Sequence, residues 1–207
     1  IVPQNPYDLA QVDIMDSRQA PGSLSSGGKY THWLGTDGAG RDLVSAMLYG
    51  LRISLAVGVM SGIIAMALGS AIGLVAAYVG GRVESIIMRI VDLQLSFPAI
   101  LVALLINGIA QTLFKGRLGG SEFWILVLSI GLSFWVQYAR TVRGMTLVEK
   151  NKEYVQAARL IGLGKTAIMF KHVLPNVLSP VLVIGTINLA LAVITEATLS
   201  FLGVGLP

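Results

Sequence analysis

Four long stretches without a charged residue constrain this chain of 207 residues more than any other feature. They cover residues 53–81, 93–114, 123–139 and 173–195. A helix needs about 20 apolar residues to cross a bilayer, whereas the outer helices of a soluble domain need polar faces. Hydrophobic residues make up 54% of the chain and charged residues 13%, against the usual quarter. The sequence therefore predicts an all-α integral membrane protein with four crossings.

Two of the predicted crossings carry further packing signals. In the first, glycines four residues apart predict a face that another helix approaches closely; they are Gly58, Gly62, Gly69 and Gly73. The third is the shortest, and we expect Arg140 to extend toward water at its end, with Trp135 and Tyr138 as anchors at the membrane interface.

The distribution of cations predicts the orientation. Residues 140–172 hold seven Lys or Arg and two acids, so the positive-inside rule places this loop in the cytoplasm. Alternation then places residues 82–89 inside, and residues 115–122 and 1–50 outside. The chain has no cysteine, which excludes disulfide and thiol chemistry.

The first 50 residues are expected to form an extracytoplasmic segment, and residues 51–207 the membrane domain. Residues 1–32 are rich in Pro, Gly and Ser, which is typical of an extended surface segment. Thr36 or Asp37 is placed to cap a helix beginning near Gly40, which we expect to lie along the outer surface at about 40–50.

The letters GLGKT at residues 162–166 match the end of a nucleotide-binding P-loop, but the match fails on spacing. The P-loop needs a glycine at the position of Arg159, and its glycines allow backbone N–H groups to surround phosphates. A dinucleotide loop would have to follow a strand, whereas the preceding residues favour a helix. No nucleotide, cofactor or metal is expected to bind this chain directly.

A loop of about 35 residues between the third and fourth crossings is expected to have structure of its own. Residues 153–160 have helical character, Gly162 and Gly164 supply a break, and residues 165–174 predict a second short helix ended by Pro175. With Ala157 and Ala158 exposed, this part predicts a compact knob for a partner with an acidic surface.

The sequence QAARLIGLGKTAIMFKHVLP resembles the cytoplasmic "EAA" loop of ABC importer permeases, whose pattern is E-A-A, three residues, G, nine residues, I-x-L-P. Two positions depart from it, Gln156 for Glu and His172 for Ile. The resemblance implies a coupling loop at about 149–175 that docks on an ATPase. Its expected coupling residues are Glu153, Gln156, Ala157, Ala158, Gly162, Gly164, Lys165, Leu174 and Pro175.

A second stretch, LGTDGAGRDLVSAMLYGLRISL, is similar to the L-G-T-D-x-x-G-R-D motif of permeases for dipeptides, oligopeptides and nickel. The motif is carried by Leu34, Gly35, Thr36, Asp37, Gly40, Arg41 and Asp42. The segments SFPAILVALL and EATLSFLGVGLP look like the same subgroup, so the resemblance covers residues 33–207. From the residues alone, Asp37 and Asp42 are expected to cap and solvate a loop.

The resemblance implies a type I importer with a MetI-like transmembrane domain in a bacterial inner membrane. Its expected partners are a second permease, two cytoplasmic ATPases that hold ATP and Mg²⁺, an extracytoplasmic substrate-binding protein and the bilayer; no nucleic acid is expected. Such permeases usually have six crossings, so the chain is expected to hold four of them, with one helix missing at each end. This chain would be a non-catalytic subunit.

Polar residues near the crossings are candidates for the path or its gate. Pro98 predicts a kink in the second crossing. Asp92 would either pair with Arg89 or act in gating, and Glu196 would either line a polar route or face interfacial water. Asn188 is a further path candidate inside the fourth crossing.

Two other classes are considered. An intramembrane hydrolase would need a Ser–His pair at membrane depth, but His32 and His172 both lie outside the apolar stretches. A channel or a transporter driven by an ion gradient would be expected to have ionisable residues at mid-membrane, and none interrupts the four stretches. The substrate stays open among peptides, nickel, glutathione and opine-like solutes.

Overall fold

The computed structural model describes residues 5–8, 12–114 and 122–205. The chain divides into two compact units, Ile1–Ala56 and Val57–Pro207. The boundary lies six residues beyond the expected one and falls inside helix α1, Leu43–Val79. The predicted connection at 115–122 lies outside the described residues except for Glu122.

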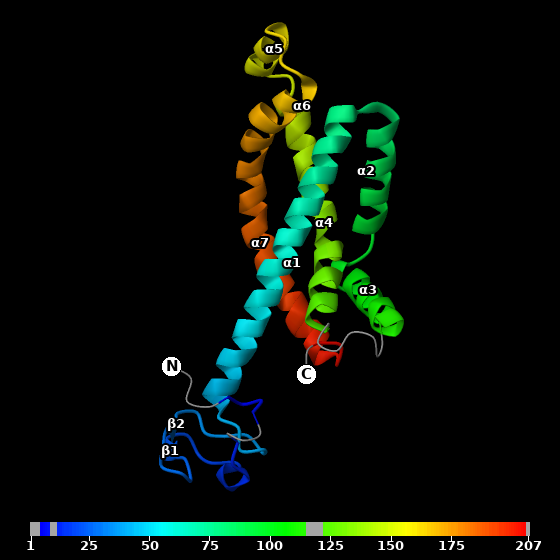
Figure 1. Ribbon diagram of the computed structural model, residues 1–207. Coiled ribbons are helices and arrows are strands. Elements are labelled where there is room, and N and C mark those ends of the chain that lie inside the picture. The colour runs from blue at the N-terminus through cyan, green and yellow to red at the C-terminus, as the bar shows by residue number, and fades with distance from the viewer. Residues whose placement is uncertain (1–4, 9–11, 115–121, 206–207) are drawn as a thin grey trace. The chain divides into compact units, whose positions relative to one another are not determined.

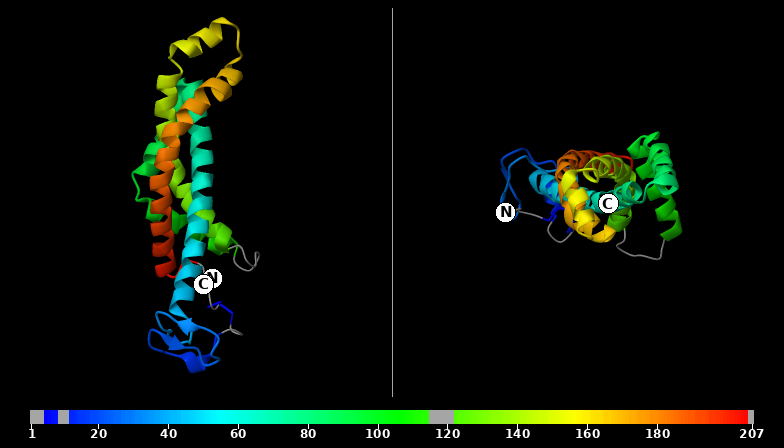
Figure 2. Two further views of the ribbon diagram at one scale, coloured as in Figure 1. Left: turned by 90° about the vertical axis from the view of Figure 1, so that its left-hand side faces the viewer. Right: turned by 90° about the horizontal axis from the view of Figure 1, so that it is seen from above.

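The unit of residues 57–207 is helical in its described part, with α4 in contact with several other helices (Figures 1 and 2). It packs against α2, α3 and α7. After the residues of α1, the elements are α2 (Gly81–Leu95), α3 (Ala99–Phe114), α4 (Glu122–Glu149), α5 (Glu153–Leu160), α6 (Lys165–Ile168), a π-helical turn (Met169–Val173) and α7 (Leu174–Phe201).

In the part of the chain that the structure describes, three helices are long and apolar enough to cross a membrane, namely Leu43–Val79, Glu122–Glu149 and Lys165–Phe201. The predicted second crossing is instead a pair of helices, α2 and α3, bent by 96° at a short break. Pro98 lies in this break, as expected of a residue that lacks a backbone N–H. The pair gives a fourth span if the bent helices are counted as one.

Glycines bring α1 against its neighbours within the unit of residues 57–207. A Cβ on Gly69 would lie 2.3 Å from the carbonyl oxygen of Trp135, and one on Gly73 would lie 2.4 Å from that of Ala139. A Cβ on Gly58 would lie 2.8 Å from the Val193 side chain. The prediction of close helix approach is confirmed for these three glycines. Among the described residues, no atom lies within 4 Å of a Cβ placed on Gly62.

The expected interface anchors on α4 are in fact involved in helix packing. Tyr138 is 1% exposed, and the indole N–H of Trp135 donates to Gln94 Oε1 of α2 at 3.1 Å. The prediction was wrong for Tyr138 because α4 is covered by neighbouring helices where an interface anchor would have to face lipid.

The described part of residues 1–56 contains more structure than an extended segment. A 3₁₀ turn, Ile14–Asp16, precedes an antiparallel pair of strands, β1 (Ser23–Leu24) and β2 (Thr31–His32), with Ser23 opposite His32. The expected helix near 40–50 is present as the first turns of α1, which starts at Leu43 and continues without a break past Arg52. Its position along an outer membrane surface stays a prediction.

Candidate functional site

The 149–175 loop lies at the end of its unit where α1 and α4 end and α2 and α7 begin (Figure 1). Lys150 Nζ donates to the Ala77 carbonyl at 2.9 Å, and the Tyr78 hydroxyl donates to the Lys165 carbonyl at 2.8 Å. These bonds tie both halves of the loop to the last turn of α1. A force applied to the loop would therefore reach α1 as well as α4 and α7.

The predicted helix 153–160 is confirmed as α5, and one of its faces is buried. Val155 is 0% exposed and Ala158 is 5% exposed. Ile168 and Val173, which follow the glycine turn in the sequence, are buried as well. Ala158 was expected on the surface, and that prediction was wrong. Val155 and Ala158 are three residues apart, so both lie on the inner face of the helix. Ala157 is exposed.

Tyr154 connects α5 to the helices on both sides of it. Its hydroxyl donates to Glu149 Oε1 at 2.5 Å and accepts from Asn176 Nδ2 at 3.0 Å. Glu149 also pairs with Lys152 at 2.9 Å. The sequence analysis missed Tyr154 and Asn176, because nothing in the sequence indicates that a tyrosine at the start of a helix will contact a residue 22 positions away.

Gly162 forms the turn after α5 and has φ +83°, where a side chain is strained. The Leu163 N–H donates to the Ala158 carbonyl, and the Gly162 N–H donates to that of Arg159, each at 3.1 Å. This is the Schellman arrangement of a helix end. Gly164 has φ −63° and no atom within 4 Å of its built Cβ, so nothing in the described structure requires glycine there.

The outer side of the loop presents small and apolar residues beside cations. Leu160 and Ile161 are 88% and 78% exposed. The other exposed members of this surface are Glu153, Gln156, Ala157, Arg159, Lys165 and Phe170. Exposed apolar clusters rimmed by charge are typical of protein–protein interfaces. We call these eight residues the α5 surface.

Pro175 does not end a helix as predicted. The π-helical turn Met169–Val173 leads directly into α7, so Leu174 and Pro175 are its first residues. The missing N–H of proline is least costly in a first turn. The His172 carbonyl accepts from Asn176 Nδ2 at 2.9 Å, which satisfies a group near the wide turn.

The L-G-T-D motif builds the unit of residues 1–56. Gly35 and Gly40 have φ +79° and +82°, and a Cβ on either would lie within 2.4 Å of a backbone oxygen. Thr36 hydrogen-bonds to the Asp16 carbonyl. Asp37 pairs with Arg41 at 2.8 Å and accepts from its backbone N–H at 3.0 Å.

His32 is fully buried between two carboxylates. Its Nδ1 lies 3.0 Å from Asp42 Oδ1, and its Nε2 lies 3.6 Å from Asp16 Oδ2. Burial alone would raise the pKa of Asp42, but hydrogen bonds from Ser45 and the contact with His32 outweigh burial and hold that pKa below 3.8. The Ser45 N–H donates to Asp42 Oδ2 at 2.8 Å, so Asp42 caps α1. The prediction that Thr36 or Asp37 caps this helix was wrong, because α1 begins only at Leu43.

Two ion pairs connect α2 to α4. Arg143 Nη2 lies 2.5 Å from Glu84 Oε1, and Arg140 pairs with Asp92. The predicted pairing of Asp92 with Arg89 was therefore wrong, because Asp92 pairs with Arg140 of α4 instead. Pro98 lies just beyond α2, and whether Asp92 or Pro98 acts as a gate stays a prediction.

The two path candidates on α7 are buried. Glu196 is 4% exposed and accepts from the Ser200 hydroxyl at 2.8 Å. Glu196 therefore does not face interfacial water, and its role in a polar route stays a prediction. Asn188 is 3% exposed.

Comparison with known proteins gives consistent matches. The family model for "Binding-protein-dependent transport system inner membrane component" matches residues 69–207. The glutathione transport permease GsiD of Pectobacterium atrosepticum is 39% identical over 88% of this chain and 58% of its own length. The oligopeptide transport permease OppC of Bacillus subtilis is 32% identical over 97% of this chain and 61% of its own length.

The chain thus spans about six tenths of the length of these curated relatives. A chain from the MetNI methionine ABC transporter, solved in inward-facing conformations, has a TM-score of 0.65 at 20% identity. The match covers 77% of this chain and 75% of that one. It confirms the predicted fold of the membrane domain.

Proposed function

Because the chain belongs to the family of binding-protein-dependent transport system inner membrane components, we propose that it is a permease subunit of an ATP-driven importer. The α5 surface carries this proposal, because it presents exposed apolar residues on a loop that is hydrogen-bonded to three longer helices, α1, α4 and α7. It is the surface on which a cytoplasmic ATPase would dock. The subunit itself is non-catalytic, and ATP and Mg²⁺ belong to its partners.

The proposed mechanism is rigid-body coupling. When the two ATPases close on ATP, the α5 surface moves with the ATPase that holds it. The bonds of Tyr154, Tyr78 and Lys150 pass this displacement to α4, α7 and α1. These helices then move between inward-facing and outward-facing arrangements as packed bodies. Ala157 allows close approach, and Gly162 fixes the turn that orients α5.

The proposed orientation places the 149–175 loop in the cytoplasm and residues 1–50 outside a bacterial inner membrane. The cations of residues 140–172 support this orientation. The outer segment and the region after Glu196 would help receive a substrate-binding protein. A second permease would complete the path.

Peptides are the proposed substrate class. Relatives named for oligopeptide transport are 32% and 38% identical to this chain, and the permease named for glutathione is 39% identical. Glutathione is itself a small peptide, so a peptide-like solute fits both names. Nickel and opine-like solutes are the alternatives to be tested beside it.

The test is import by the full complex reconstituted in proteoliposomes with its ATPases and binding protein. We expect peptide uptake to require ATP and both ATPases, and to persist when proton and sodium gradients are collapsed. Uptake driven by an ion gradient without the ATPases would instead support an ion-coupled transporter or a channel.

A further inference from the structure

Polar side chains hold α2 against α4 near both ends of α2. Close to its beginning, Arg143 Nε of α4 donates to Glu84 Oε1 at 2.7 Å. Close to its end, Gln94 uses both atoms of its amide: Oε1 accepts from the Trp135 indole at 3.1 Å, and Nε2 donates to the Leu132 carbonyl at 2.8 Å. Both ends of α2 are therefore hydrogen-bonded to α4.

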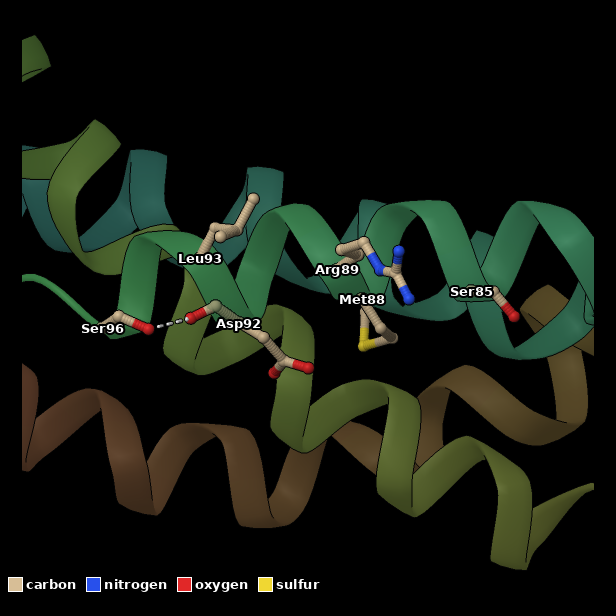
Figure 3. A pocket seen from close by; sticks show the side chains of 6 residues that line it. All are labelled: Ser85, Met88, Arg89, Asp92, Leu93 and Ser96. Atoms are coloured by element: carbon tan, nitrogen blue, oxygen red, sulfur yellow. Dashed lines mark hydrogen bonds between the residues drawn. The ribbon is translucent and has the colours of Figure 1, made fainter.

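The middle of α2 contacts α4 as well. Asp92 pairs with Arg140 of α4. The Asp92 carboxylate leaves α2 on the same side as the Met88 side chain (Figure 3). Met88 packs against a small buried cluster formed by both helices, whose members are Val91, Val136 and Ala139. Apolar packing thus fills the space between the polar contacts.

The spread of these contacts along α2 limits how the two helices can move against each other. Gln94 follows Glu84 ten residues later, which is about 15 Å along a helix. A single contact would let two helices pivot, whereas contacts separated by this length resist both sliding and rotation. Helices held in this way move as one rigid body when a domain changes its conformation.

The three polar contacts differ in strength. The side chains of Asp92 and Arg140 are 56% and 59% exposed, and ion pairs between exposed side chains contribute little. The Glu84 side chain is only 17% exposed, and both Nε and Nη2 of Arg143 lie within 2.7 Å of its Oε1. Charged hydrogen bonds of this kind are the stronger ones. Glu84 and Gln94 therefore supply most of the polar attachment of α2.

The attachment begins next to the 149–175 loop. Arg143 lies in the last two turns of α4, which ends at Glu149, where Tyr154 of α5 is bonded. At its other end α2 leads into the break at Pro98 and then into α3. The contacts with α4 thus place α2 between the loop and this break.

We propose that Glu84, Gln94 and Arg143 are positioning residues for coupling. They hold α2 on α4, so the two helices move as one body when an ATPase displaces the 149–175 loop. This inference rests on the proposed ATP-driven import. Displacement of the loop reaches the break before α3 through α2, in addition to its direct effect on α1, α4 and α7.

Replacing the ion pair by a covalent link tests this role. The chain has no cysteine of its own, so Glu84→Cys together with Arg143→Cys supplies two thiols in an importer whose other subunits are made cysteine-free. Without a link, we expect the ratio of peptide imported to ATP hydrolysed to fall by about three-fold or more. A short bis-maleimide that joins the two thiols should restore most of this ratio, because α2 is again held on α4.

The controls separate joining from modification. N-ethylmaleimide reacts with the same thiols and leaves α2 and α4 unlinked, so the ratio should stay low. Glu84→Gln, which removes only the charge, should lower the ratio as well. Ser85→Ala should keep the wild-type ratio, because the Ser85 hydroxyl donates to the Gly81 carbonyl of its own helix at 3.0 Å. A purely structural role would lower the amount of assembled complex and leave the ratio for each complex unchanged.

Two results would overturn the role of Glu84 and Arg143. One is a wild-type ratio in both Glu84→Gln and the unlinked cysteine variant. The other is a ratio that stays low or falls further once mass spectrometry has verified the link, since α2 would then have to move relative to α4 during transport. Absence of ATP-dependent import by the wild-type complex would count against the proposed function instead, so the two failures are distinguishable.

Discussion

The Tyr154 hydroxyl donates a 2.5 Å hydrogen bond to Glu149 Oε1, so α5 is fastened to the last residue of α4. The same oxygen accepts from Asn176 of α7. One side chain therefore connects the α5 surface to two of the helices expected to cross the membrane. If the surface is where an ATPase acts, its stiffness depends on this contact.

Replacing Tyr154 by Phe removes this connection and keeps the ring. We expect the local stability of α5 to fall by about 1–2 kcal/mol, because Glu149 and Asn176 each lose a partner. Hydrogen exchange of the amides of residues 153–160 in the purified complex measures the change. Gln156→Ala, which removes an exposed bond to the Asn151 carbonyl, is the control and should change protection by less than about 0.5 kcal/mol.

The two glycines of the turn should respond differently to alanine. Gly162→Ala places a side chain at φ +83° and should cost about 1–2 kcal/mol. Gly164→Ala meets no atom within 4 Å at an ordinary φ of −63° and should be neutral. The measurement is the ratio of peptide imported to ATP hydrolysed, which we expect to fall only for Gly162→Ala. Equal ratios in the two variants would show that the turn does not orient α5.

Packing of α1 on α4 predicts a second glycine contrast. A Cβ on Gly73 would lie 2.4 Å from the Ala139 carbonyl oxygen, so the helices must separate in Gly73→Ala. We expect a loss of about 1–3 kcal/mol in the free energy of unfolding. Gly62→Ala, whose Cβ has no atom within 4 Å, should retain full stability. Thermal unfolding in detergent compares the two, and similar melting temperatures would contradict the packing described for these helices.

The unit of residues 1–56 should lose stability in acid. Although burial opposes it, hydrogen bonds from Ser26 and contact with His32 hold the pKa of Asp16 below 3.8, as Ser45 and His32 do for Asp42. Carboxylates with a depressed folded pKa stabilise the fold above their unfolded pKa, and this contribution is lost as pH falls through the folded pKa. The protection of residues 12–45 against hydrogen exchange, relative to the intrinsic exchange rate at each pH, should therefore fall below about pH 4.

Asp42→Asn is the matched variant for this pH dependence. It should lower protection of the first turn of α1 at pH 7 by about 1–3 kcal/mol, since His32 and Ser45 lose a charged partner. The acid-dependent loss should be smaller in this variant than in wild type. A pH profile unchanged from wild type would show that Asp42 is not a source of the acid sensitivity.

The apolar spans and the 149–175 loop were predictable because their signals are local. Charge-free stretches, the break at Pro98, the helix 153–160 and the Gly162 turn follow from length, side-chain chemistry and backbone preference. What failed depends on contacts between distant residues. Examples are the burial of Tyr138 and Ala158, and the partner of Asp92, which lies 48 residues away in Arg140.

Pro175 was misjudged for a different reason. A proline was expected to end the helix before it, but a π-helical turn places it in the first turn of α7, where no N–H is required. The strands and the His32 contacts in residues 1–56 form from short segments without a hydrophobic period. Such structure depends on pairing, which composition does not reveal.

The most direct test of coupling through the α5 surface is peptide import by a complex that carries Ala157→Glu. Ala157 is exposed, so a longer side chain at this position should leave the buried Val155 and Ala158 in place. A bulky acid should block docking of the ATPase on this surface. We expect a complex that unfolds at the wild-type temperature, with import reduced by about ten-fold or more. Wild-type import by the Ala157→Glu complex would show that the α5 surface does not couple the ATPase to transport.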